Sequence, residues 1–262
     1  MRKNLIIFKL HLIKILTEKE VILNWSISNG IALIGIIVVW FASNRNIIGG
    51  YTKNELVSYY FFMFIYSQVI GWWVFWDVRK NIRDGSLSNF LLKPISYVKY
   101  LILQETAYKL INLITQILIG IIIYIFIKNF IVITFDIEDL AKLIPVIFIG
   151  ISINFLSHFF IGCFTFFWLE SYFLSDFHWI FSRFLSGLVV PLTFFPFFVE
   201  RILLLNPFRF TFSLPAEIIF NQINSQDYYK VLLIGFIWVG IFVVSSMYIW
   251  KVGLRRYSAY GS

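Results

Sequence analysis

Six long apolar runs alternate with short polar segments along the 262-residue chain, and this pattern predicts membrane-spanning helices. A span needs about 20 predominantly apolar residues. Lipid offers no partner for backbone amides, so the runs must be helices and not open strands. The predicted spans are residues 21–41, 55–76, 109–127, 143–168, 184–199 and 231–250. We therefore expect an all-α polytopic membrane protein with both termini on one side of the bilayer.

Composition supports one membrane domain over residues 1–262. Sixty per cent of the residues are hydrophobic and 14% are charged. A water-soluble domain of this length could not bury so much apolar surface. The single cysteine, Cys163, cannot form an internal disulfide, so it carries no information on the redox compartment.

Local signals refine the ends of several spans. Thr52 and Glu55 have the spacing of a capping box, in which side-chain oxygens satisfy free amides of the first helical turn. Pro145 is predicted in the first turn of the fourth span, where its missing N–H does no harm. Pro191 and Pro196 interrupt the fifth apolar run.

The distribution of Lys and Arg favours cytoplasmic termini. With both termini inside, seven basic residues fall in outer segments: Arg45, Lys53, Lys128, Lys142, Arg201, Arg209 and Lys230. Fourteen fall in inner segments: Arg2, Lys3, Lys9, Lys14, Lys19, Arg79, Lys80, Arg83, Lys93, Lys99, Arg183, Lys251, Arg255 and Arg256. Cytoplasmic loops are enriched in such residues. Topology thus accounts for the net charge of +8, which gives no reason to expect nucleic acid as a partner.

Residues 1–20 are predicted to form an amphipathic helix at the cytoplasmic interface. The apolar residues of one helical face are Leu5, Phe8, Leu12, Ile15 and Leu16. Lys9 and Lys14 interrupt any apolar core of a cleaved signal peptide. An interfacial helix that leads into the first span fits this pattern, and the alternative is a continuous extension of that span.

Residues 77–100 form a charged segment between the second and third spans, which we call the handle. Residues 77–84 are expected to continue the second span as helix. Gly85 suits the position after a helix end, where a positive φ is needed. Ser86 and Ser96 are candidate N-caps of two following helices, and Pro94 ends the first of them.

The short helix of the handle has one apolar face, formed by Leu87, Phe90, Leu91 and Pro94. Two interpretations remain open. An exposed apolar face beside charged residues is typical of a docking surface. Equally, the segment could be a solvated loop whose apolar face rests on the membrane.

Residues 200–229 are too polar for a span and too apolar for an ordinary outer loop. Two Pro-containing dipeptides, at Pro207 and Pro215, divide the segment into short pieces. Irregular backbone at membrane depth is tolerated only against protein or a water-filled cavity. We therefore predict a re-entrant outer hairpin in which Glu217 needs a polar partner, with Arg201 and Arg209 as candidates.

The order of these features resembles the permease subunits of type-2 ABC exporters over nearly the whole chain. The resemblance rests on the amino-terminal helix, six spans, the segment from Ile82 to Pro94 and the segment from Asn206 to Glu217. It implies that the handle carries a coupling helix that contacts an ATPase, with these residues: Arg83, Asp84, Gly85, Ser86, Leu87, Phe90, Leu91, Leu92 and Pro94. It likewise implies paired outer half-helices, with these residues: Asn206, Pro207, Arg209, Pro215 and Glu217.

The resemblance also sets expectations about partners. No phosphate-binding Gly-x-x-x-x-Gly-Lys-Ser/Thr sequence occurs in the chain, so ATP and Mg²⁺ should bind to a separate ABC ATPase subunit. We expect a homodimer or a paired permease heterodimer in the plasma membrane, with no cofactor or metal on this chain. The small-residue pairs Ser26–Gly30 and Ser182–Ser186 could let helices approach closely, or their spacing could be chance. The resemblance favours the first and fifth spans as the dimer contact. Substrate identity does not follow from the fold.

Alternative functions are an ATP-independent carrier or channel, or a membrane scaffold. The histidines His11, His158 and His178 are scattered without metal-ligand spacing, which disfavours an intramembrane enzyme. Glu105 and Lys109 are four residues apart and are interpreted as a structural pair. Few carboxylates fall at mid-membrane depth, which disfavours a proton-coupled carrier.

The predicted topology can be tested with single cysteines in a Cys163→Ser background. Ile137→Cys should react with an impermeant thiol reagent in intact cells, and Ser88→Cys should not, because the charge bias places residue 88 inside. Labelling in the opposite pattern would invert the model.

Overall fold

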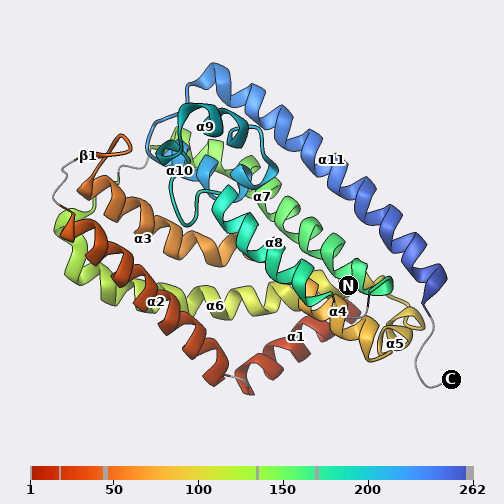
Figure 1. The fold of residues 1–262 in the computed structure, drawn as a ribbon. Helices are drawn as coiled ribbons and strands as arrows, with labels where there is room; N and C mark the ends of the chain where they lie inside the picture. Colours follow the sequence, from red (N-terminus) through yellow and green to blue (C-terminus); the bar gives the residue numbers. More distant parts are fainter. Residues whose placement is uncertain (1, 18, 44–46, 134–135, 169–170, 258–262) are drawn as a thin grey trace.

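The computed structural model describes the whole chain except residues 1, 18, 44–46, 134–135, 169–170 and 258–262 and is mainly helical (Figure 1). The α-helices are α1 (Arg2–Thr17), α2 (Lys19–Ala42), α3 (Lys53–Ile70), α4 (Phe75–Arg83), α5 (Leu87–Leu91), α6 (Tyr97–Ile127), α7 (Ile137–Cys163), α8 (Tyr172–Leu185), α9 (Phe197–Leu203), α10 (Ser213–Ile219) and α11 (Ser225–Arg256). The short elements are β1 (Ile47–Ile48), β2 (Tyr51–Thr52), η1 (Lys128–Phe130), η2 (Phe164–Phe166), η3 (Leu192–Phe194) and η4 (Pro207–Thr211).

Within the described residues, five segments are helical, long and apolar enough to cross a membrane: Glu20–Ala42, Lys53–Arg83, Tyr97–Phe130, Ile137–Phe166 and Gln226–Arg256. The chain is thus a multi-pass membrane protein, but the predicted count of six spans is not confirmed. Residues 184–199 do not form one helix. Helix α8 starts earlier, at Tyr172, and ends at Leu185, and Gly187 then takes a positive φ of 85°.

The structure also places Arg183 and Pro145 differently from the sequence prediction. Arg183 lies inside α8 near its end and not in an inner loop, because the helix begins eleven residues before it. Pro145 lies inside α7 and not in its first turn, because that helix already begins at Ile137. Both corrections have one cause: polar or charged residues beside an apolar run were taken as loop, although they continue the helix.

Helix α1 is separate from α2 and packs along α6 (Figure 1). Its apolar residues Phe8, Leu12 and Ile15 contact Ala107 and Ile111 of α6. The two helices run in different directions, so the prediction of a distinct amino-terminal helix is preferred over a continuous extension. Its depth in the membrane remains a prediction.

The second membrane segment is broken between α3 and α4. The N–H of Gly71 closes α3 on the carbonyl of Ser67 at 2.9 Å. The N–H of Trp72 donates to Oδ1 of Asn154 at 2.8 Å, and the N–H of Trp73 donates to the carboxylate of Glu105. Amides freed by the break therefore find side-chain acceptors on α7 and α6, as burial requires.

The first span contacts its own chain through the predicted small residues. The hydroxyls of Ser26 and Thr115 lie 2.9 Å apart, which joins α2 to α6. A Cβ at Gly30 would lie 3.1 Å from Ile119 of α6. These two residues therefore serve the α2–α6 contact within one chain. The assignment of the first and fifth spans as dimer contacts stays a prediction.

Helix α7 is the centre of the bundle and packs along α11 and against η4. The close approach depends on Gly150, where a Cβ would lie 2.6 Å from the carbonyl oxygen of Phe210. At the opposite end of the bundle, the hydroxyl of Tyr257 donates to the carbonyl of Gly85 at 2.8 Å. The start of α1, the end of α11 and the handle thus lie at one end of the molecule (Figure 1).

We predict that Gly150→Ala destabilises the protein, because its Cβ would clash with backbone of η4 and not with a flexible side chain. Overpacking of this kind typically costs about 1–3 kcal/mol. The matched control is Gly240→Ala in α11, where no atom lies within 4 Å of the added Cβ. A thermal unfolding temperature equal in both variants would contradict the tight α7–η4 contact.

Candidate functional site

The handle folds as two short helices around a glycine turn. Helix α4 ends at Arg83, Gly85 has the predicted positive φ of 76°, and α5 runs over Leu87–Leu91. Ser86 occupies the N-cap position but does not cap α5, because its hydroxyl instead donates to Oδ1 of Asn81 at 3.1 Å. Ser96 caps α6 as predicted, accepting from the N–H of Lys99.

The apolar side of α5 faces the protein itself. Leu87 is fully buried in a cluster that includes Val78 of α4 and Leu101 of α6. The ring of Phe90 lies 4.5 Å from that of Tyr100 and 5.5 Å from that of Tyr97. Leu87 is thus covered by the chain itself and does not belong to the exposed surface of the handle, in contrast to the expected apolar docking face.

A different set of handle residues is exposed. The side chain of Leu92 is 86% exposed and that of Leu91 is 47% exposed. They are accompanied by further exposed residues: Arg83, Asp84, Lys93 and Pro94. Leu92 immediately follows α5. The apolar face that helical periodicity predicted did not include it. The exposed surface is thus a leucine pair with charged residues on both sides.

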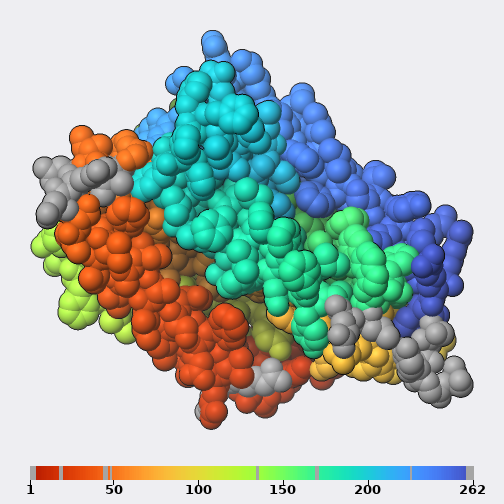
Figure 2. Space-filling model, in the orientation of Figure 1, coloured from red at the N-terminus to blue at the C-terminus, as the bar shows by residue number. Residues whose placement is uncertain are grey.

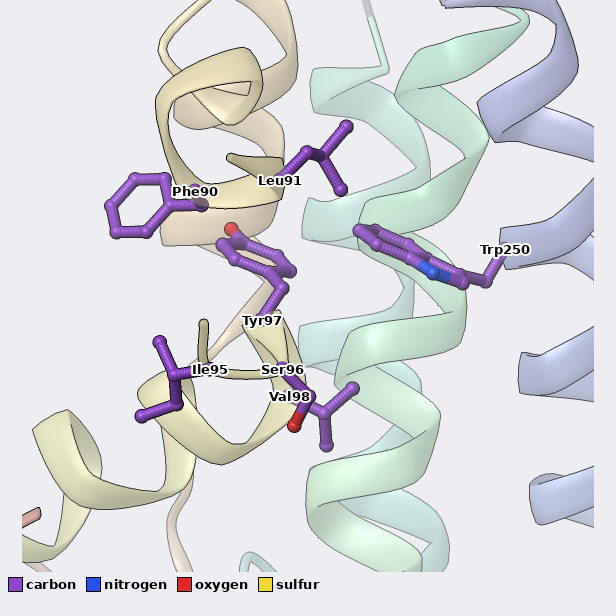
Figure 3. A pocket seen from close by; sticks show the side chains of 7 residues that line it. All are labelled: Phe90, Leu91, Ile95, Ser96, Tyr97, Val98 and Trp250. Atoms are coloured by element: carbon purple, nitrogen blue, oxygen red, sulfur yellow. The ribbon is translucent and has the colours of Figure 1, made fainter. Parts of the chain in front are cut away.

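Figure 3 shows a small pocket of about 250 Å³ between the handle and Trp250 of α11. Its wall contains Phe90, Leu91 and Tyr97, and the ring of Tyr97 stacks on Trp250 at 5.4 Å. The handle is therefore seated on α6 and α11 through aromatic contacts. Displacement of α5 would disturb the ends of these two long helices.

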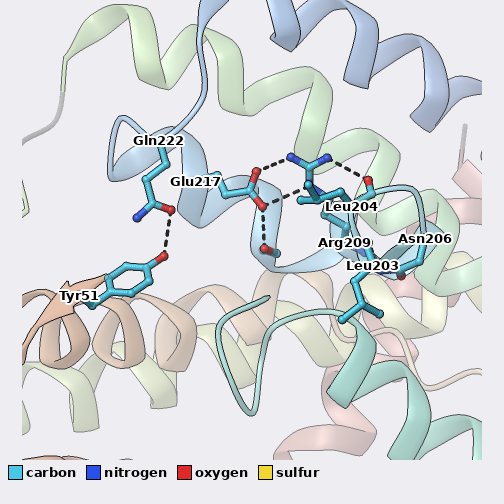
Figure 4. A network of polar contacts seen from close by, with 8 residues as sticks. Tyr51, Leu203, Leu204, Asn206, Arg209, Glu217 and Gln222 are labelled. Atoms are coloured by element: carbon cyan, nitrogen blue, oxygen red, sulfur yellow. Dashed lines mark hydrogen bonds and ion pairs between the residues drawn. The ribbon is translucent and has the colours of Figure 1, made fainter. Parts of the chain in front are cut away.

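Residues 200–229, which we call the outer segment after their predicted position, form a compact polar network, shown in Figure 4. Asn206 caps η4 by accepting from the N–H groups of Phe208 and Arg209, and Pro207 occupies the first turn. Pro215 likewise lies in the first turn of α10, where a missing N–H is harmless. Both prolines therefore start short helices, as the predicted division of this segment requires.

Glu217 has the polar partner that the sequence predicted, and the partner is Arg209. The guanidinium Nε donates to Oε1 at 3.2 Å, and one terminal nitrogen lies 2.5 Å from Oε2. Ser213 donates a further hydrogen bond to Oε1 at 2.7 Å. Arg201 lies instead over the ring of Phe197. The side chains of Arg209 and Glu217 are only 8% and 15% exposed.

A second contact joins this segment to the loop before α3. The hydroxyl of Tyr51 donates to the side-chain oxygen of Gln222 at 2.9 Å (Figure 4). Burial raises the pKa of the Tyr51 phenol to about 12, so it stays a protonated donor at any physiological pH. The outer segment is thus joined to β2 through Gln222.

The structure brings together two histidines that the sequence analysis treated as scattered. The rings of His158 in α7 and His178 in α8 lie 4.7 Å apart between their centroids. No cluster of three metal-ligating side chains occurs in the described part of the chain. Sequence spacing could not reveal the pair, because the two histidines lie on different helices.

We predict that Glu217→Ala lowers stability by about 3 kcal/mol or more, because removing one partner leaves Arg209 buried and unpaired. The matched control is Asp227→Ala, which breaks the exposed Asp227–Lys230 pair, with 59% and 76% side-chain exposure. That change should cost less than about 1 kcal/mol. Equal thermal shifts in the two variants would show that the outer network is not buried.

The comparisons with known proteins agree with this architecture. Among curated proteins, none matches the sequence. The family model described as ABC-2 family transporter protein matches residues 26–261, which include most of the first described spanning helix, the other four, the handle and the outer segment. The chain therefore belongs to the ABC-2 family of transporter proteins, as a membrane permease.

Proposed function

We propose that this chain is the permease subunit of an ATP-driven ABC exporter and moves a substrate out of the cytoplasm. ATP and Mg²⁺ would bind to a separate ATPase subunit, and the handle would be the contact with that subunit. The observation that carries this proposal is the exposed pair Leu91–Leu92 on a firmly seated base. Membership in the permease family supports it.

An ATPase can drive its partner only through contacts whose free energy differs between nucleotide states. The handle suits this role because its two sides differ. Leu91 and Leu92 are exposed and can contact a partner. Leu87 and Phe90 pack against the rest of the chain, so they would transmit a displacement of α5 to α4 and α6. Helix α4 leads directly to the break at residues 71–74. A push on α5 would thus reach the middle of the second membrane segment.

The proposed assembly contains two permease chains, identical or paired, in the plasma membrane with cytoplasmic termini. The common location of both termini and the handle supports one cytoplasmic face. Helix α2 has an exposed apolar face that includes Trp25, Ile31 and Val39. Such a face suits lipid or a second chain.

The coupling role is tested by the double variant Leu91→Ala, Leu92→Ala. A buried apolar anchor contributes about 2 kcal/mol or more to an interface, so affinity for the ATPase should fall about thirtyfold. Membrane abundance should be unchanged, because these two side chains are exposed. Co-purification of the ATPase and ATP-dependent export from cells should both be lost.

The matched control is Ile121→Ala, Ile122→Ala, an adjacent exposed apolar pair on α6, far along that helix from its start at Tyr97 beside the handle. It should retain co-purification. Full ATPase binding and export by the leucine variant would exclude the handle as the coupling contact. Transport that persists without any ATPase would favour the alternative of an ATP-independent carrier.

A further inference from the structure

A recess of about 700 Å³ lies within one chain between α2 and α8, with α3, α4 and α6 behind them. Figure 2 shows this hollow from its open side. The volume falls in the range of pockets that bind drug-sized ligands. We call it the aromatic recess, because four tryptophans contribute to its wall: Trp25, Trp73, Trp76 and Trp179.

Charge in the recess is sparse. Among its lining residues, Asp176 and Arg183 carry a charge, and both lie on α8. They are seven residues apart, which is about 10 Å along a helix, too far for an ion pair. The guanidinium of Arg183 lies 4.1 Å from the ring centroid of Trp179 and 5.4 Å from that of Trp73.

Arg183 has no anionic partner among the described residues. Its Nε is buried without a hydrogen-bond partner, and no ion pair involves it. The other end of α8 approaches the handle, where Tyr172 accepts from Arg83, so Arg183 lies far from that end of the bundle. A partly buried cation without an anion costs free energy, and ionisable residues within membrane segments mark binding sites.

The remaining wall is suited to the body of an amphiphile. Indole faces pack against planar apolar groups. Three amide side chains, those of Asn29, Gln68 and Asn112, offer hydrogen-bonding groups in the same recess. The floor includes Trp73, which belongs to the break between α3 and α4. A ligand here would touch the segment that the handle is proposed to move.

We propose that the aromatic recess binds a small amphiphilic organic anion, with a planar apolar body against the tryptophans and a carboxylate or sulfonate on Arg183. This inference deepens the proposed function by naming the class of cargo. The positive charge without a counterion selects the anion, and the volume and aromatic wall select a compact planar molecule over a bulky polar one.

The test uses the purified chain in phosphatidylcholine nanodiscs, where binding requires neither ATPase nor transport. The probes are 1-pyrenebutyrate and the neutral 1-pyrenebutanol, followed by energy transfer from tryptophan. Binding should saturate and should exceed the binding to empty nanodiscs. The affinity for the anion should be about tenfold or more higher than for the neutral probe, because hydrogen bonds to charged groups are stronger than those between neutral groups. Equal affinity of the unsubstituted protein for the two probes would overturn the proposal.

Variants identify the residue responsible. Arg183→Gln should remove the preference for the anion and leave binding of the neutral probe unchanged, and Arg183→Lys should retain part of the preference. The matched control is Arg201→Gln, which removes another arginine that lies over an aromatic ring but outside the recess. An anion preference that survives Arg183→Gln would overturn the assignment.

Two further outcomes would assign the recess to another occupant and would also overturn the proposal of an organic anion. One is displacement of the probe by phosphatidylglycerol added to the nanodiscs, which would indicate a lipid headgroup. The other is failure of Asn29→Cys, in a Cys163→Ser background, to react with a thiol reagent, which would indicate that a second chain fills the recess. Loss of ATPase coupling would instead contradict the proposed function and leave this binding result intact.

Discussion

Every backbone amide inside a bilayer needs a partner within the protein, and the breaks in this chain are built around that constraint. Asn154 and Glu105 accept from the amides at the break in the second segment. After α8, the carbonyls of Gly187 and Val189 accept from the hydroxyls of Tyr59 and Tyr60 in α3. At both of these places, polar side chains of neighbouring helices reach the irregular backbone.

Much of the fold follows from local sequence. Apolar run length identified five of the membrane helices, and the Thr52–Glu55 capping box and the Ser96 cap have the predicted hydrogen bonds. The prediction for residues 184–199 was wrong because apolar composition there serves packing against α3, and Gly187 takes a backbone conformation that ends the helix. Composition cannot separate an apolar turn from an apolar helix.

The candidate sites show the same division between local and long-range information. The Arg209–Glu217 pair could be predicted because two opposite charges in a short apolar segment need each other. Leu87 could not be placed correctly, because its face of α5 is covered by α4 and α6, and helical periodicity does not say what covers a face. Arg183 was missed because its significance lies in tryptophans from α8 and from the break at residue 73.

The bond between Tyr257 and Gly85 joins residues 172 positions apart in the sequence. Trp250 supports the same region by stacking on Tyr97. During synthesis, the handle emerges long before the helix that holds it. A nascent chain without α11 would present Leu91 and Leu92 on an incomplete base. Productive engagement of a partner at the handle would therefore report that the last membrane helix has been inserted and packed.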